Sequence, residues 1–294
     1  SFSISLEIFL FNFSLQLFFG PRLKNYFLIP ELGSTTLSEK PFFSSRFCSL
    51  LNELNSIALS INFSEKFIEK ANMLVKVTSN DFQEQSISLG EPLMATCNII
   101  NQSKIKFGDS IVIIGDGYMS QLLISGLAKY PLKQLVVVGH HDLRLEMAEK
   151  FGATTVINSK ESNAWEKLMS LTDRKGFDIS VEYAGNANSL RLAASVCKAK
   201  ERAKLVLAAG YSEKMEFSIA NYLQNRAPII IPGYPNQSED KIRDLKQGMF
   251  GLEEGIFPMN KLITHRYKLE NIQQGFEESM NREDGYIKGI INPN

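Results

Sequence analysis

The sequence predicts an α/β protein with a doubly wound parallel sheet, the Rossmann arrangement, and three observations support this fold class. Short, β-branched apolar runs recur along the second part of the chain, as in strands buried on both faces. These runs are Ser110–Ile114, Gln134–Val138, Thr154–Ile157, Asp178–Val181, Lys204–Ala208 and Pro228–Ile231. Stretches with helical spacing follow them at Met119–Leu127, Leu143–Phe151, Ala164–Leu171, Ser189–Val196 and Ser238–Phe250. The alternation itself is the third observation, because parallel neighbours need a crossover and a helix usually supplies it.

Composition excludes several kinds of partner. The 294 residues hold 32 Lys and Arg against 32 Asp and Glu, so no strong field would recruit nucleic acid or an anionic membrane, and neither partner is expected. Three cysteines, Cys48, Cys97 and Cys197, lie far apart without a C-x-x-C pair. This usage suits a reducing compartment, and we expect buried apolar cysteines rather than ligands.

The first part of the chain is Ser-, Asn- and Phe-rich with irregular patterning, and a domain boundary is predicted between Asn101 and Phe107. The first twenty residues are apolar enough to suggest a signal peptide or a membrane span. Glu7, Asn12 and Gln16 interrupt them, and no basic residue or small-residue cleavage motif flanks them. We therefore expect strand structure there and a cytoplasmic protein.

The first predicted strand runs directly into the letters GDGYMS, residues 115–120, and then into a helix. Gly115 permits a tight turn, and Gly117 has no side chain to block a pyrophosphate. Tyr118 and Met119 open the helix, whose free N–H groups and positive dipole end favour an anion. Ser120 takes the third glycine position and is small enough for close packing. An ordinary strand-to-helix turn is the alternative, but the position at the first strand of a βαβ run favours NAD or NADP binding.

The end of the second predicted strand selects between these two cofactors, since an acidic side chain there would bind the ribose hydroxyls and repel a 2′-phosphate. Here Gly139 stands at that point, followed by His140 and His141. The missing acid weakens the case for NAD and favours NADP. Either histidine could contact a 2′-phosphate with support from Arg144, or both could be solvated surface residues.

Eight segments between Phe63 and Pro293 resemble the medium-chain dehydrogenase/reductase family of zinc-type alcohol and polyol dehydrogenases. They read FIEKANMLVKV, GEPLMATCNII, KFGDSIVIIGDGYMSQLLISGLAK, LRLEMAEKFGATTVINSKE, GFDISVEYAGN, AKLVLAAGY, KLITHRYKLENIQQGFE and DGYIKGIINP. The resemblance implies a NAD(P)-binding Rossmann domain over residues 101–254. It also implies a shortened, mainly-β GroES-like domain of the catalytic type over residues 1–100, with parts of 255–294 packing back on it.

The resemblance also implies roles for individual glycines. Gly115 and Gly117 match the pyrophosphate turn, and Gly139 matches the ribose-discriminating position. Gly185 and Gly210 match the two strand ends that approach the nicotinamide.

Two further positions match family features. Lys288, in GYIKGII, matches a basic residue that often contacts the cofactor phosphates, the alternative being a solvated lysine in a terminal strand. His265, in the frequent ITH motif, is interpreted as structural.

One departure from the family concerns zinc, which relatives bind through an early Cys, a His-Glu pair and a ligand on the segment here read as GEPL. No histidine precedes His140, and the sister cysteines of Cys48 are missing. Glu91 stands at the last ligand position, but one carboxylate cannot hold zinc, so we assign it a surface role at the end of a helix or strand. Catalytic zinc is not expected.

The predicted function is an NAD(P)-dependent oxidoreductase that moves a hydride between nicotinamide and a small alcohol or carbonyl substrate. No residue announces itself as the donor that replaces zinc, so the catalytic residues stay unknown; chemically suitable side chains are Tyr26, Lys40, Ser44 and Ser45. A cofactor-binding remnant, sensor or assembly subunit without activity is the alternative. The resemblance also suggests a homodimer through the Ala227–Pro232 run, whose prolines would limit the edge strand, with burial inside the monomer as the alternative.

Overall fold

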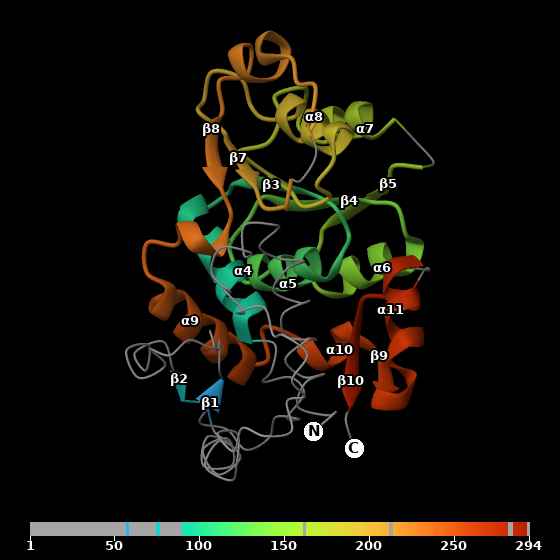
Figure 1. Cartoon of the computed structure of the whole chain (residues 1–294). Coiled ribbons are helices and arrows are strands. Elements are labelled where there is room, and N and C mark those ends of the chain that lie inside the picture. The colour runs from blue at the N-terminus through green and yellow to red at the C-terminus, as the bar shows by residue number, and fades with distance from the viewer. Residues whose placement is uncertain are drawn as a thin grey trace, which may run out of the picture. The chain divides into compact units, whose positions relative to one another are not determined.

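The computed structural model describes residues 57–58, 75–76, 90–160, 163–211, 214–281 and 285–292 (Figure 1). These belong to one compact unit that spans residues 57–292. The predictions for residues 1–56, among them the strand reading of the first twenty residues and the roles of Cys48, Tyr26, Lys40, Ser44 and Ser45, lie outside the described residues.

Six parallel strands form the main sheet in the order β5-β4-β3-β6-β7-β8. Their bounds are β3 (Ser110–Ile114), β4 (Gln134–Gly139), β5 (Thr155–Asn158), β6 (Ile179–Glu182), β7 (Lys204–Leu207) and β8 (Ile229–Pro232). The chain starts in the middle with β3, adds two strands outward, then returns to add three on the other side. This is the doubly wound order, so the predicted fold class is confirmed.

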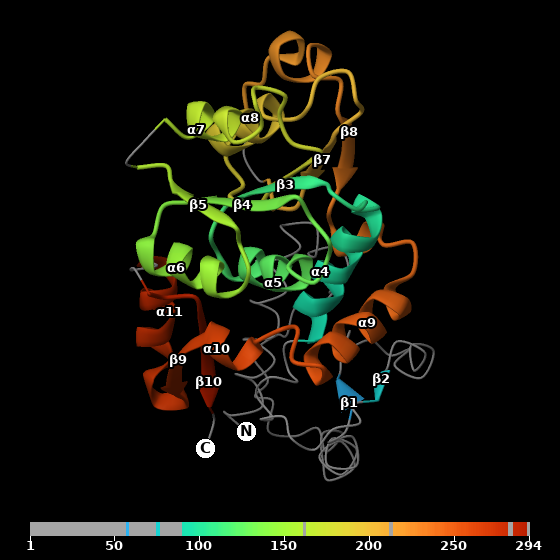
Figure 2. The same cartoon turned by 180° about the vertical axis from the view of Figure 1, so that it is seen from behind.

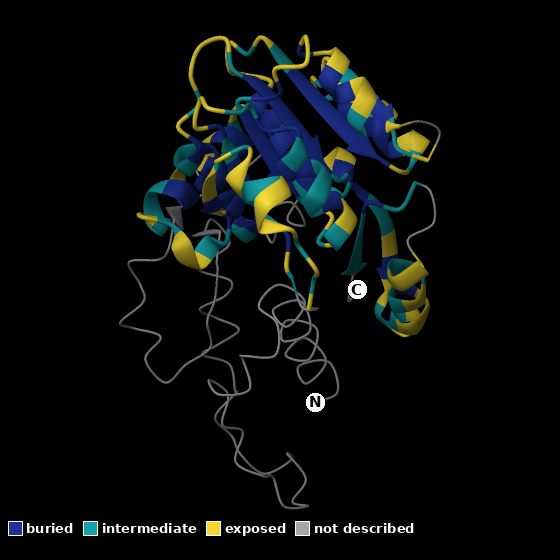
Figure 3. Ribbon diagram, turned by 90° about the horizontal axis from the view of Figure 1, so that it is seen from above, coloured by how far each residue is buried: buried dark blue, intermediate teal, exposed yellow. Residues whose placement is uncertain are grey.

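Helices cover both faces of the sheet (Figures 1 and 2). One face carries α4 (Gly90–Ser103), α5 (Tyr118–Leu127) and α6 (Asp142–Lys150), and the other carries α7 (Ala164–Ser170) and α8 (Ala187–Ser195). Side chains alternate across β3: Ile111 and Ile113 join the core with α5 and α6, while Val112 and Ile114 join the core with α7 and α8. All five β3 residues are buried because both faces are covered, as the buried strands in Figure 3 illustrate.

Helix α4 was not predicted, because its GEPLMATCNII letters are apolar on nearly every side and show no helical periodicity. Eleven of its 14 residues are buried. It packs on α5 and on α9 (Lys241–Glu253), where a Cβ on Gly248 would lie 2.7 Å from Cβ of Leu93. The predicted domain boundary at Asn101 begins inside this helix, and the division into domains stays a prediction.

The remaining described elements follow or precede the main sheet. They are β1 (Ile57–Ala58), β2 (Val75–Lys76), a π-helical turn (Ile219–Gln224), 3₁₀ turns at Pro235–Gln237 and Leu269–Asn271, α10 (Met259–Leu262), β9 (Ile263–Lys268), α11 (Ile272–Asn281) and β10 (Lys288–Asn292). Strands β9 and β10 pair in parallel and form a sheet separate from the main one. Among the described residues, no helix combines the length and apolarity needed to cross a bilayer.

Candidate dinucleotide site

Gly115 makes the turn that follows β3. Its φ of +122° lies in a region that side chains rarely adopt, and a Cβ there would lie 3.2 Å from backbone atoms of Tyr183 and Ala184. Its N–H donates to the carbonyl of Val138 at 2.8 Å. The turn is therefore pressed against the ends of two neighbouring strands, and glycine is required for conformation and for space.

Gly117 has a different role from Gly115. Its backbone is extended, with φ −75° and ψ −178°, and no side chain caps the helix α5 that follows it. A Cβ on Gly117 would meet no atom of the described residues within 4 Å. The first N–H groups of α5, beginning at Tyr118 and Met119, therefore face an open cradle at the positive end of a helix dipole. This arrangement fits the pyrophosphate of a dinucleotide. Ser120 is 1% exposed and packs inside the fold, as its small size predicts.

An acidic side chain lies beside Gly139, although the sequence of β4 offers none. The carboxylate of Asp116, the residue between the two glycines of the turn, accepts the N–H groups of His140 at 2.7 Å and His141 at 2.9 Å. A Cβ on Gly139 would lie 2.4 Å from its Oδ2. The interpretation that this position lacks an acid is therefore wrong, because the acid reaches it from the neighbouring strand end.

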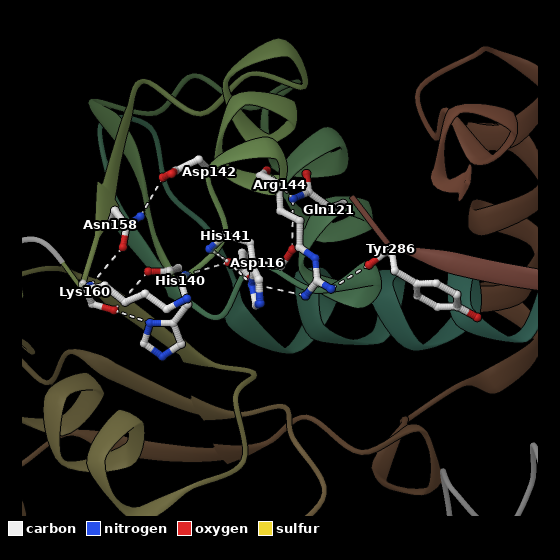
Figure 4. A network of polar contacts seen from close by, with 11 residues as sticks. Asp116, Gln121, His140, His141, Asp142, Arg144, Asn158, Lys160 and Tyr286 are labelled. Carbon is white, nitrogen blue, oxygen red and sulfur yellow. Dashed lines mark hydrogen bonds and ion pairs between the residues drawn. The ribbon is translucent and has the colours of Figure 1, made fainter. Parts of the chain in front are cut away.

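Asp116 stays ionised although it is 7% exposed. Burial by itself would raise the pKa of its carboxyl, but the hydrogen bonds from the His140 and His141 backbone and from the His141 ring, whose Nδ1 lies 3.1 Å away, outweigh burial and lower that pKa. Arg144 adds a positive charge, with Nη1 3.6 Å from Oδ1 of Asp116. Figure 4 shows these groups gathered around the carboxylate.

Arg144 is 5% exposed and does not stand on the surface as support for a 2′-phosphate. Its Nη2 donates to the carbonyl of Tyr286 at 2.6 Å, so the guanidinium is engaged inside the protein. His140 is exposed, and its Nδ1 lies 2.7 Å from Oγ of Ser159. Of the three polar residues predicted near the adenosine ribose, only His140 and His141 are at least partly exposed to solvent.

The ends of β6 and β7 meet at Gly185 and Gly210, because a Cβ on Gly185 would lie 3.1 Å from the carbonyl oxygen of Gly210. The fully buried carboxylate of Glu182, the last residue of β6, holds these ends. Its Oε1 accepts the N–H groups of Ala184 at 2.8 Å and Gly185 at 2.9 Å, and its Oε2 accepts the O–H of Tyr211. Sequence reasoning missed Glu182, since a charged residue at a strand end is usually solvated.

Lys288 and Glu91 lie near the start of α5. Neither is fully solvated, although the sequence left a solvated lysine as the alternative for Lys288 and suggested a surface role for Glu91. The ammonium of half-buried Lys288 lies 5.2 Å from the centroid of the Tyr118 ring, and burial lowers its pKa. Glu91, in the first turn of α4, has a buried Oε1 without a hydrogen-bond partner among the described residues. Glu91 stands at a helix end, as predicted, but its carboxylate is partly buried and not fully at the surface. His265 stacks on Tyr286 with ring centroids 4.5 Å apart, consistent with a structural part.

We expect the burial of Glu91 to make stability fall as pH rises. Burial raises the pKa of its carboxyl from 4.5 to about 7, and the charge of Lys288 opposes this. The folded state thus keeps a proton that the unfolded chain releases, so stability declines across that pH window. Glu91→Gln should flatten the decline of the urea midpoint, whereas Glu254→Gln, at an exposed position, should leave it unchanged. An equal decline in wild type and Glu91→Gln would contradict the assignment.

The described residues form no metal site, since nowhere among them do three His, Cys, Asp or Glu side chains gather. Cys97 and Cys197 are buried, as expected, and burial raises the pKa of each thiol to about 12. A protonated, buried thiol is a poor nucleophile and a poor ligand. The prediction that catalytic zinc is absent stays a prediction, because Cys48 lies outside the described residues.

Comparisons with known proteins agree with this geometry. A family model described as zinc-binding dehydrogenase matches residues 121–242. Sorbitol dehydrogenase of Bacillus subtilis is 24% identical over 235 residues, with 78% of this chain and 63% of the relative covered. An uncharacterised zinc-type alcohol dehydrogenase-like protein of Escherichia coli is 27% identical over 207 residues, with 69% and 56% covered. The chain therefore spans less than two thirds of the length of either relative.

A solved structure supports the same fold. An oxidoreductase/dehydrogenase of unknown specificity from Escherichia coli superposes with a TM-score of 0.67 at 23% sequence identity, covering 78% of this chain and 62% of that one. At this identity the likeness concerns the fold.

Proposed function

We propose that the chain, which resembles the medium-chain dehydrogenase/reductase family, is an NAD(P)-dependent oxidoreductase acting on a small alcohol or carbonyl substrate. The observation that carries the proposal is the open cradle at Gly117, under the uncapped start of α5. A turn that served folding alone would need no empty space in front of free N–H groups.

The residues of this chain divide the work of binding. The N–H groups of Tyr118 and Met119 bind the pyrophosphate, and Lys288 places its ammonium near the same helix start. Gly185 and Gly210 add no side chain of their own where two strand ends meet at the nicotinamide end. When bound, the nicotinamide supplies the carbon that gives or accepts a hydride, and the protein holds the substrate carbon in reach of it.

No step of the proposed mechanism runs through zinc. The three histidines of the sequence are His140, His141 and His265, and the described residues gather no metal site. A polar donor of the chain would then polarise the carbonyl oxygen in place of a metal. The catalytic residues stay unassigned.

The choice between NAD and NADP rests on opposing features at Gly139. The carboxylate of Asp116 would disfavour a 2′-phosphate, but Arg144 offsets its charge and its Oδ2 already accepts two backbone N–H groups. His140 and His141 would favour the phosphate. Both cofactors are therefore kept in the proposal, with NADP as the one favoured by the sequence.

A second candidate is a cofactor-binding protein without catalytic activity, as a sensor or an assembly subunit. The observation that favours it is the missing ligand set, because no histidine precedes His140. Binding without turnover on any alcohol, polyol or sugar would distinguish this candidate from the enzyme.

We expect calorimetric titration of the full chain with NADH and with NADPH to give micromolar binding of at least one. A panel of alcohols, polyols and their carbonyl products, followed through nicotinamide absorbance, then tests activity, and metal content is measured on the same sample. If neither cofactor binds, the proposal is wrong. Stoichiometric zinc would contradict the zinc-free form of it.

We also propose that the chain forms a homodimer through β8. This strand ends the sheet, and the side chains of Ile229 and Ile230 are 39% and 45% exposed rather than buried inside the monomer. An exposed edge with apolar residues favours pairing with another strand, and Pro228 and Pro232 limit its length. The cytoplasmic location and the absence of nucleic-acid and membrane partners stay predictions from composition.

A further inference from the structure

Three parts of the proposed cofactor site lie on separate elements. The pyrophosphate turn follows β3, the ribose loop (His140 and His141, directly after Gly139) follows β4, and Lys288 is the first residue of β10. The first two belong to the main sheet, whose hydrogen bonds fix them relative to each other. Strand β10 belongs to another sheet, so something else must set the position of Lys288 relative to the turn.

The ion pair between Arg144 and Asp116 connects these parts, and Figure 4 shows its contacts with His140, His141 and Tyr286. From the first half of α6, Nη1 of Arg144 faces Asp116 of the turn at 3.6 Å, and its Nη2 donates to the carbonyl of Tyr286, two residues before Lys288, at 2.6 Å. The same carboxylate accepts both backbone N–H groups of the ribose loop. A single ion pair thus touches the turn, the loop and the approach to Lys288.

Gln121 of α5 forms hydrogen bonds with the backbone of both residues of this pair. Its Nε2 donates to the carbonyl of Arg144 at 2.9 Å and to the carbonyl of Asp116 at 3.2 Å, and its side chain is fully buried. A guanidinium presents several N–H groups in a rigid plane, so one arginine can contact a carboxylate and a carbonyl in fixed geometry. Ile287 packs in the same apolar core as Leu122. Apolar contacts are non-directional, so they fix the orientation of this segment less well than the hydrogen bonds of the guanidinium do.

We propose that Asp116 and Arg144 are a positioning pair, which couples the ribose loop to Lys288 so that both ends of the adenosine diphosphate part of the cofactor are recognised together. The inference rests on the proposed function. Neither residue takes part in hydride transfer; Arg144 acts through the backbone of Tyr286, and Asp116 acts through Arg144 and through the backbone of His140 and His141.

A double-mutant cycle tests the coupling. The dissociation constant of ADP-ribose is measured by calorimetry for wild type, Arg144→Met, Lys288→Met and the double variant. We expect each single change to weaken binding about tenfold, since each removes an interaction of a charged group. The double variant should lose much less than the hundredfold that independent effects would give.

Matched variants separate positioning from a general structural effect. Arg191→Met removes another arginine that donates to a backbone carbonyl, that of Glu216 at 2.7 Å, on the other face of the sheet, and should leave binding within about twofold. Arg144→Lys keeps the charge without the planar group and should recover part of the loss. It also serves as the test if Arg144→Met does not fold.

Hydrogen exchange on the cofactor-free protein gives a second readout. Arg144→Met should speed amide exchange in residues 285–292 while the strands of the main sheet keep their protection. Additive losses in the cycle, or unchanged exchange in β10, would overturn the inference while NAD(P)H binding by wild type leaves the proposed function intact. Failure of wild type to bind ADP-ribose, NADH and NADPH would overturn both.

Discussion

Replacing Gly117 by valine should weaken the binding of NADH and NADPH about a hundredfold while the protein keeps its fold. The backbone at Gly117 is one that any residue adopts, and among the described residues no atom would lie within 4 Å of an added Cβ. The new side chain would instead fill the space in front of the α5 N–H groups. A clash of about 3 kcal/mol corresponds to roughly a hundredfold loss of affinity. Calorimetry measures the loss, and the thermal midpoint checks the fold.

Gly115→Ala is the matched contrast for this prediction. Its positive φ and the backbone atoms at 3.2 Å from the added Cβ mean that this change should lower stability itself. A Gly117→Val protein that binds either cofactor as wild type does would remove the pyrophosphate assignment. A Gly117→Val protein that unfolds would show that the cradle is not open.

Replacing Glu182 by alanine should give the largest loss of stability among the changes considered. The carboxylate is fully buried and accepts two backbone N–H groups and the Tyr211 hydroxyl. Alanine would leave three partly buried donors without this acceptor, and a cavity in place of the buried carboxylate. We expect about 4 kcal/mol of lost unfolding free energy in urea titrations.

Tyr211→Phe provides the smaller step of the same series. It removes one hydrogen bond to the carboxylate and leaves the two backbone bonds, so about 2 kcal/mol is expected. Glu182 holds the backbone of Gly185, which lies beside Gly210 at the nicotinamide end of the proposed site. Both changes should therefore also weaken cofactor binding, and Glu182→Ala should weaken it more. Equal stabilities of the two variants would mean that the backbone bonds to Glu182 contribute nothing.

The strands of the main sheet could be predicted to within one residue at each end, because burial on both faces selects continuous β-branched runs such as Ser110–Ile114. Helix ends were harder where a cap decides them. Helix α9 begins at Lys241 rather than at Ser238, since a 3₁₀ turn occupies Pro235–Gln237 and the side chain of Asp240 then caps the helix by accepting the Arg243 N–H.

The candidate site was harder to predict for a different reason. The glycines of the turn can be recognised because their requirement is local. The partners of Asp116 and Arg144, and the Tyr211 partner of Glu182, come from distant parts of the chain. A one-dimensional reading assigns the ribose position to the residue at the end of β4. It cannot show that a side chain from the preceding turn reaches the same place, nor that the carbonyl of Tyr286, two residues before β10, accepts a hydrogen bond from Arg144.

The packing of Asp116 against Gly139 constrains how this chain could evolve a new cofactor preference. An acidic residue at the end of β4 is the ordinary route toward NAD, but here its first side-chain atom would overlap the carboxylate already present. A substitution at Gly139 would therefore be tolerated only in a lineage that had first shortened Asp116. The two positions form an epistatic pair, because a side chain at position 139 is accommodated only after Asp116 has been replaced by a smaller residue. The order of the two mutations therefore decides whether the second is tolerated.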